Sequence, residues 1–241
     1  IVLEVEGLSR SPVLHNISFQ LKRGEILGFA GLMGAGRTEL ARAIFGADPV
    51  DSGEIKIHGK KVTIHSPYDA VRLGVGYLSE DRKRFGCITE MDVRTNTAVA
   101  SMHRFHKAGW INNKRIDQVS EQSVEQLAIK TPSIRQQLKF LSGGNQQKVV
   151  IGKWLTRDCD ILIFDEPTRG IDVGAKAEIY NLLHQLAAQG KSIIVISSEL
   201  PEILRLSHRI VVMCEGRITG ELRGSDATQE QIMSYATQRI S

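Results

Sequence analysis

The octapeptide LSGGNQQK at residues 141–148 constrains this chain more than any other stretch of the sequence. It predicts the start of a helix that runs to about residue 157, with the Ser142 hydroxyl as its N-cap. The first turn of a helix offers free backbone N–H groups and the positive end of the helix dipole. Because Gly143 and Gly144 carry no side chains, an anion can approach these groups closely. The octapeptide therefore predicts a phosphate-binding helix start.

A second phosphate-binding element lies far upstream, where GLMGAGRT at residues 31–38 follows a predicted strand over 26–30. A helix is expected over 38–45 and ends at Gly46. Strand, glycine loop and helix in this order form the context of a Walker A loop, whose backbone amides surround the phosphates of a nucleotide. The Thr38 hydroxyl is expected to bind Mg²⁺. The alternative, a glycine turn without a ligand, loses weight because the other motifs indicate the same chemistry.

An apolar strand predicted over residues 161–164 ends in two carboxylates, Asp165 and Glu166. Strands and helices alternate from there to about residue 213, which indicates a parallel sheet with right-handed crossovers. Short β-rich segments come first in the chain, and residues 93–155 have a mostly helical pattern that is broken near Pro132. A hairpin around Glu215-Gly216 and a helix from Thr228 follow at the end. The sequence thus predicts an α/β protein driven by a nucleotide.

Composition indicates no particular partner. Lys and Arg (31) exceed Asp and Glu (27) by only 4, without the concentrated basic face that is typical of nucleic-acid binding. The longest apolar runs have the length of strands and are too short to span a bilayer. The three cysteines have no metal-ligand spacing and are expected to be reduced thiols. Trp110 and Trp154 are expected to pack inside the fold.

The motifs together resemble those of the ATP-binding-cassette (ABC) ATPases. In that family a Walker A loop, a signature and a Walker B strand have the order found here at 31–38, 141–148 and 161–166. More narrowly, the chain is similar to the second cassette of monosaccharide importers of the ribose, galactose and xylose type. The segments that carry this likeness are GLMGAGRTEL (31–40), SEDRK (79–83), LSGGNQQK (141–148) and DEPTRGIDVG (165–174).

The resemblance implies an α/β P-loop NTPase fold. Its parts are a RecA-like core with a parallel sheet, an antiparallel β subdomain and a helical signature subdomain at about 85–155. Residues 1–241 are expected to form a single cassette. Because the first residue is Ile1 and not Met, we expect this cassette to be a piece of a tandem two-cassette chain.

The resemblance also implies roles for single residues. The nucleotide is expected to bind Gly31, Gly34, Ala35, Gly36, Arg37, Thr38 and Glu39. Mg²⁺ is expected at Thr38, Glu80 and Asp165, while Glu166 polarises the attacking water as general base. Gly170-Ile171-Asp172 matches the D-loop of the family, a segment that faces a second cassette. The γ-phosphate of the ATP bound by that second cassette is expected to be covered by Ser142, Gly143, Gly144 and Gln146.

Four departures from the family pattern weaken one nucleotide site. Arg37 stands in place of lysine, Glu80 in place of glutamine, and Ser198 in place of the catalytic sensor histidine. Residues 7–16 contain no Phe, Tyr or Trp to stack on adenine, which removes ~1–3 kcal/mol of stacking. A broad guanidinium also differs in shape from the compact lysine ammonium. We therefore expect ATP or ADP to be held with slow or no turnover, while the intact signature completes the partner's site.

Two alternatives stay open. In the first, Arg37 is a tolerated variant and Glu166 supports ordinary hydrolysis. In the second, the chain is a soluble, translation-associated cassette protein without a membrane partner. A DNA-repair ATPase is disfavoured, because residues 38–142 contain neither a heptad run nor a cysteine cluster.

The implied partners are the first cassette of the same polypeptide, transmembrane permease subunits and, indirectly, a periplasmic sugar-binding protein, but no nucleic acid. The expected location is the cytoplasmic face of the bacterial inner membrane. There two cassettes close head-to-tail around two ATP molecules and drive the permease. Residues 81–84 are expected either to form a solvated loop or to face the permease. The identity of the sugar is not encoded here, because specificity resides in the permease and the binding protein.

Overall fold

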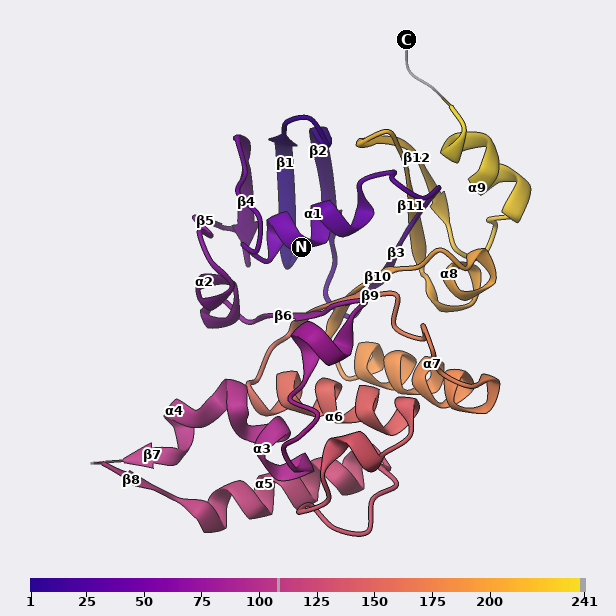
Figure 1. The fold of residues 1–241 in the computed structure, drawn as a ribbon. Helices are drawn as coiled ribbons and strands as arrows, with labels where there is room; N and C mark the ends of the chain where they lie inside the picture. Colours follow the sequence, from indigo (N-terminus) through magenta and orange to yellow (C-terminus); the bar gives the residue numbers. More distant parts are fainter. Residues whose placement is uncertain (108, 239–241) are drawn as a thin grey trace. The chain divides into compact units, whose positions relative to one another are not determined.

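The computed structural model describes residues 1–107 and 109–238 (Figure 1). These residues form two compact units. The first contains Ile1–Tyr77, Asp160–Pro167 and the chain from Leu183 onward, and the second contains Leu78–Cys159 and Thr168–Leu182. Each unit is assembled from segments that lie far apart in the sequence. Among the described residues, no helix is both long enough and apolar enough to cross a membrane.

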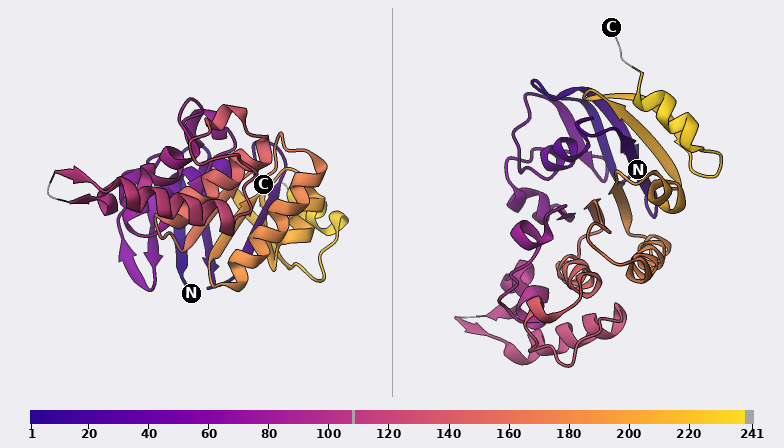
Figure 2. Two further views of the ribbon diagram at one scale, coloured as in Figure 1. Left: turned by 90° about the horizontal axis from the view of Figure 1, so that it is seen from below. Right: turned by 45° about the vertical axis from the view of Figure 1, so that its right-hand side comes forward.

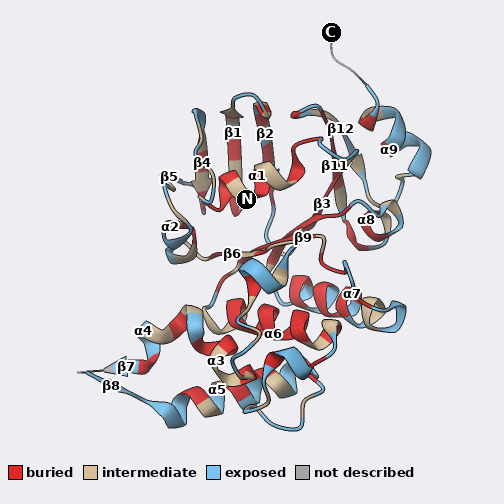
Figure 3. Ribbon diagram, viewed as in Figure 1, coloured by how far each residue is buried: buried red, intermediate tan, exposed pale blue. Residues whose placement is uncertain are grey.

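A six-stranded sheet of order β12-β11-β3-β10-β9-β6 forms the centre of the first unit. Strand β10 pairs in parallel with β3 and β9, and β11 pairs in parallel with β3. All residues of β9 and β10 are buried, as expected for parallel strands that are covered on both faces (Figure 3). The expected parallel sheet is therefore confirmed. Its strands are Ile26–Gly31 (β3), Val75–Leu78 (β6), Ile161–Asp165 (β9), Ser192–Ile196 (β10), Arg209–Cys214 (β11) and Arg217–Arg223 (β12).

An antiparallel sheet of order β2-β1-β4-β5 belongs to the same unit. Burial alternates along β2, where Ile17, Phe19 and Leu21 are buried and the residues between them are exposed. This period of two is typical of a sheet with one face on the core. The four strands are Leu3–Arg10 (β1), Leu14–Leu21 (β2), Ser52–Ile57 (β4) and Lys60–Val62 (β5).

The helices of the first unit begin where the sequence supplies caps. Helix α1 starts directly after the glycine loop, as predicted. Thr228 opens α9 through a capping box, in which Thr228 and Gln231 each accept a backbone N–H of the other. Strands β11 and β12 form the predicted hairpin. The helices are Arg37–Ile44 (α1), Pro67–Arg72 (α2), Leu200–Leu206 (α8) and Gln229–Ala236 (α9), while Val173–Ala188 (α7) has residues in both units.

The second unit is mainly helical. Its core contains Ala98, Phe105 and Ile116, with Met102 and Val119 packed against them. The helical pattern predicted over 93–155 is confirmed for most of its length, and the break expected near Pro132 lies in residues 127–142, which contain no α-helix. A two-stranded hairpin also interrupts the pattern and was not predicted. A π-helix, Arg82–Gly86, was not predicted. Two short 3-10 helices span Val99–Ser101 and Leu138–Phe140. The other elements are Val93–Ala98 (α3), Met102–Phe105 (α4), His106–Lys107 (β7), Trp110–Ile111 (β8), Asn113–Gln126 (α5) and Gly143–Thr156 (α6).

The two tryptophans have opposite environments. Trp110 lies on the β7–β8 hairpin, which projects from the second unit in every view (Figures 1 and 2). Its side chain is 81% exposed, so the prediction that it packs inside the fold is wrong. The physical reason is that two strands of two residues each cannot cover a large ring. Trp154, on α6, is buried as predicted.

Candidate nucleotide site

The glycine loop between β3 and α1 has the geometry of a phosphate cradle. Gly34 and Gly36 have φ angles of 78° and 96°, in the left-handed region that favours glycine. A Cβ atom on Gly36 would lie 3.1 Å from the Val13 carbonyl oxygen, so the close approach of these backbones also favours glycine here. Helix α1 begins at Arg37, and the backbone N–H groups of its first turn have no carbonyl partners within the helix. The loop can therefore donate several N–H groups to one anion.

Arg37 is directed toward the sheet. The residue is 8% exposed, and its Nη1 donates a hydrogen bond of 2.5 Å to the backbone oxygen of Ser197, just after β10. Burial lowers the pKa of Arg37, and the nearby carboxylates of Glu166 and Asp165 partly oppose that shift. One edge of the planar guanidinium is thus hydrogen-bonded within the protein.

Thr38 and Asp165, both predicted to hold a metal, lie together in the first unit. The Thr38 hydroxyl donates to Asp165 Oδ1 at 3.1 Å, and the Tyr77 hydroxyl donates to Asp165 Oδ2 at 2.8 Å. A hydroxyl and a carboxylate are oxygen ligands that suit Mg²⁺, which also retains waters and binds nucleotide phosphates. These two side chains therefore fit an ion held jointly with a nucleotide. Tyr77 was not predicted, because only the pairing of β6 with β9 brings it there.

Asp165 makes the stability of the fold depend on pH. Its burial raises the pKa of the carboxyl, although hydrogen bonds from Tyr77 and Thr38 oppose this shift. The contribution of such a group is fully present below its unfolded pKa and is lost as the pH rises through the raised folded pKa. In buffer without Mg²⁺, Asp165→Asn is expected to stabilise the protein at pH 7 by about 1 kcal/mol. That gain corresponds to a Tm increase of about 2–4 °C.

Urea unfolding of both proteins between pH 3 and 8 measures this effect. The stability difference is expected to disappear toward pH 3, where Asp165 of the unmodified protein is protonated in both states. An Asn variant that is less stable than the unmodified chain at pH 7 would contradict the assignment.

Glu166 and Ser198, the two residues predicted to be catalytic, contact each other. The Ser198 backbone N–H donates to Glu166 Oε1 at 2.7 Å, and the Glu166 N–H donates to the Ile196 oxygen at 2.8 Å. Glu166 has a φ of 51°, which is uncommon for a residue with a side chain and is often found at functional sites. Position 198 thus orients the Glu166 carboxylate through its backbone.

The start of α6 in the second unit matches the predicted phosphate-binding helix start. Ser142 is the N-cap, and its hydroxyl accepts from the Asn145 backbone N–H at 3.4 Å and from the Asn145 side chain at 2.8 Å. A Cβ on Gly144 would lie 2.8 Å from the Cβ of Ala175. Gln146 is different, because its side chain is 5% exposed and its amide donates to the oxygens of Leu138 and Leu141. In this conformation the Gln146 amide holds the segment before the helix.

Two further predicted residues lie in the second unit. The Glu80 carboxylate forms an ion pair with the Arg169 guanidinium. Asp172 caps α7, because its Oδ1 accepts from the Ala175 N–H at 2.9 Å. Glu80 and the Thr38–Asp165 pair belong to different units, so a metal site that includes Glu80 stays a prediction. Arg169 and the neighbouring Arg82 carried no signal in the sequence beyond their charge.

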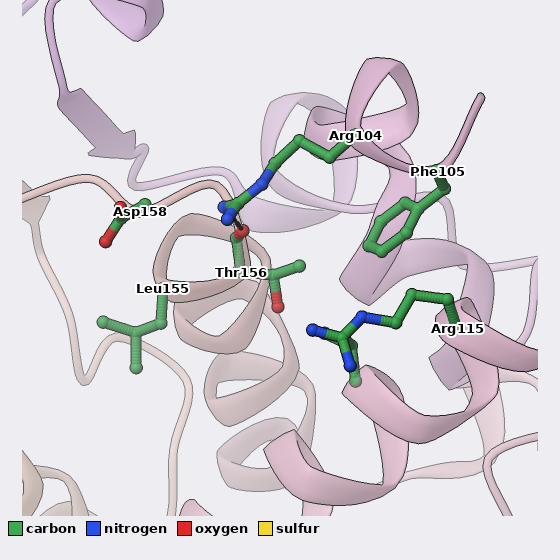
Figure 4. Close-up of a pocket in the computed structure, with 7 residues that line it drawn as sticks. Arg104, Phe105, Arg115, Leu155, Thr156 and Asp158 are labelled. Carbon is green, nitrogen blue, oxygen red and sulfur yellow. Dashed lines mark hydrogen bonds between the residues drawn. The ribbon is translucent and has the colours of Figure 1, made fainter. Parts of the chain in front are cut away.

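Each of the two units contains a cavity. One of about 430 Å³ in the first unit is large enough for a small molecule. It lies beside Gly34 and Gly36 of the glycine loop, with His15 and Arg217 also in its wall. The second, of about 370 Å³, lies in the second unit (Figure 4). There Arg104 donates to the Thr156 oxygen at 2.8 Å and so caps the end of α6, while the Arg115 guanidinium has no charged partner among the described residues.

Comparison with known proteins agrees with these motifs. Residues 14–169 match the family model described as "ABC transporter". Over its full length the chain is 66% identical to the "Putative ribose/galactose/methyl galactoside import ATP-binding protein 1" of Burkholderia lata. It is 52% identical to a protein of similar name from Geobacillus kaustophilus. The chain spans about half of the length of these relatives, 47% and 48%.

Solved structures show the same fold. The ADP conformation of an ATP-binding cassette of an ABC transporter has a TM-score of 0.80 at 22% identity, with 98% of this chain and 94% of that chain covered. A dimeric bacterial ABC transporter cassette has a TM-score of 0.75 at 20% identity, with 92% and 98% covered. These likenesses confirm the predicted α/β cassette fold with a parallel and an antiparallel sheet.

Proposed function

This chain belongs to the ABC transporter family, and we propose that it is the nucleotide-binding cassette of an importer that couples ATP to monosaccharide uptake. Relatives named as ribose/galactose/methyl galactoside import ATP-binding proteins support the substrate class. The main observation in support of the proposal is that one chain forms two elements suited to bind phosphate. These are the glycine loop before α1 and the Ser142-capped start of α6.

In this function each group of the first unit has a defined task. Backbone N–H groups of the glycine loop bind the phosphates, and Thr38 and Asp165 hold Mg²⁺ against them. When bound, the ion neutralises charge on the phosphates. The Glu166 carboxylate, oriented by the Ser198 N–H, is placed to accept a proton from water.

We further propose that this site turns over slowly and that the main role of the chain is to complete another cassette's site. Three contacts support a weakened site. Arg37 is bound to the Ser197 oxygen, Glu80 is paired with Arg169, and Ser198 offers Glu166 only a backbone N–H. At the start of α6 the Gln146 amide is turned inward, but the Ser142 cap and the glycine N–H groups can still cover a γ-phosphate from the opposite side.

The proposed partners are a first cassette, permease subunits and, through them, a periplasmic sugar-binding protein. The proposed location is the cytoplasmic face of the inner membrane. Phe85, Met91 and Phe140 are large apolar side chains of the second unit that are 61%, 49% and 68% exposed. Hydrogen bonds from Leu138 to Met91 and from Lys139 to Thr89 bring these segments together. This exposed apolar surface, next to residues 81–84, supports a permease contact there.

Turnover by this chain alone tests the slow site. We expect ATP hydrolysis well below ~1 s⁻¹ in the presence of Mg²⁺, the lower end of the usual enzyme range. A coupled phosphate-release assay measures it, with nucleotide binding confirmed separately by calorimetry. The competing function, an ordinary hydrolysing cassette, is favoured by the intact Thr38–Asp165 pair and by Glu166. Turnover at or above that rate would establish it instead.

A further inference from the structure

Arg82 connects two segments of the second unit that are distant in sequence. Its Nη1 donates a hydrogen bond of 3.0 Å to the backbone oxygen of Arg169, which precedes the D-loop. On its other side, a Cβ atom on Gly143 would lie 2.8 Å from Arg82 Nη2 and 3.1 Å from the Gly170 oxygen. The guanidinium therefore lies between the D-loop segment and the first residue of α6.

Two further contacts fix the segment that carries Arg82. The Glu80 carboxylate pairs with the side chain of Arg169. At the other end of the π-helix, the Gly86 oxygen accepts a hydrogen bond of 2.6 Å from Lys153 Nζ, which belongs to α6. Arg82 thus projects from a backbone that is tied both to α6 and to the D-loop segment. A π-helix in a short connection is often found at a functional site.

The position of Arg82 is unfavourable in two respects. Its Nε is buried and has no hydrogen-bond partner among the described residues. Its positive charge also lies at the start of α6, where the helix dipole is itself positive. An apolar side chain could fill this space without either penalty. Packing alone therefore does not account for an arginine here, whereas a link between the D-loop segment and α6 does.

We propose that Arg82 is a positioning residue for ATP hydrolysis. It holds residues 169–172 against the first turn of α6, so that the N–H groups at Gly143 and the carboxylate of Asp172 meet a second cassette as one rigid surface. A side chain at Gly143 would place its Cβ 2.8 Å from Arg82 Nη2, so the guanidinium would have to move. The inference rests on the proposed function, in which the start of α6 completes the site of another cassette.

The test uses the complete native assembly, with all changes confined to this cassette. Arg82→Ala is expected to lower kcat for ATP by about 10- to 100-fold, because small misplacements of a site have effects of that size. The KM for ATP should change by less than about twofold. Arg82→Lys should not restore the rate, because a point charge cannot contact both the Arg169 oxygen and Gly143. Amide hydrogen exchange at residues 170–172 should become faster in Arg82→Ala.

Arg115→Ala is the matched control, since it removes a guanidinium from the same unit that has no charged partner among the described residues (Figure 4). It should leave kcat and amide exchange unchanged. Ser142→Asp distinguishes a failure of the proposed function from a failure of the role of Arg82. If it leaves turnover unchanged, the proposed function is wrong. If it abolishes turnover while Arg82→Ala keeps more than half of kcat, the role of Arg82 is wrong. Full rescue by lysine, or unchanged exchange at 170–172, would also overturn that role.

Discussion

Ser142→Asp in this cassette is expected to lower ATP turnover by the proposed two-cassette assembly by about 100-fold or more. Aspartate is a good N-cap, so the substitution preserves the start of α6 while adding a negative charge. That charge lies where the γ-phosphate of the opposite cassette is expected, and the two repel each other. The loss would therefore arise from electrostatics at an intact helix start.

Ser142→Asn is the matched control, because asparagine has the shape and capping ability of aspartate without its charge. It should keep turnover within about tenfold of the unmodified protein. Thermal unfolding of the variants should show similar Tm values. Phosphate release by the purified assembly, with the proposed permease subunits present, measures the rates. Equal losses for Asp and Asn would mean that the added negative charge is not what slows turnover, and the proposed γ-phosphate contact would lose this support.

ATP turnover of the assembly with Glu166→Gln in the same cassette provides the complementary measurement. If the site of this cassette is slow, removal of its general base should change assembly turnover by less than about twofold. A strong effect at Ser142 with a weak effect at Glu166 is a pattern that a symmetric pair of sites cannot produce. A loss of most activity in Glu166→Gln would show that both sites hydrolyse ATP.

The sequence predicted those parts of the fold that depend on local signals. The order of strand, glycine loop and helix over β3 and α1 follows from hydrophobic runs and glycine positions. The same is true of Asp165 at the end of β9 and of the Ser142 cap. In each case the residues that define the element are close together in the sequence, so their pattern can be recognised without tertiary information.

Contacts between distant segments could not be predicted in this way. Tyr77 reaches Asp165 only because β6 is the neighbour of β9. Arg82 meets Gly143 and Arg169 through the packing of three segments, and an arginine in a charged run is usually solvated. The inward orientation of Gln146 also depends on the turn that precedes α6. Trp110 was misjudged because the short hairpin that exposes it has no clear sequence signal.

The second large effect is a gain of activity. The triple variant Arg37→Lys, Glu80→Gln, Ser198→His is expected to raise ATP turnover by this chain alone by about 100-fold. A lysine is too compact to be held as the guanidinium is by the Ser197 oxygen, so its ammonium can contact phosphates. A neutral glutamine in place of Glu80 would no longer be ion-paired with Arg169, while the hydrogen bonds of Arg82 to Arg169 and of Lys153 to Gly86 still hold the segment. The backbone of residue 198 already contacts Glu166, so a histidine there would lie close to the proposed general base.

The gain needs no second protein, because the chain carries an unaltered signature. Two copies of the triple variant can each complete the other's repaired site, which the unmodified chain cannot do productively. Sedimentation with ATP and Mg²⁺ should therefore show a dimer, and phosphate release should accompany it. Adding Ser142→Asp to the triple variant should remove the gain, because it disables the partner's nucleotide site. Adding Glu166→Gln should also remove the gain, because it disables the variant's own site. A triple variant that binds ATP and dimerises without faster turnover would show that residues 37, 80 and 198 do not limit this site, and the asymmetry would then need another cause.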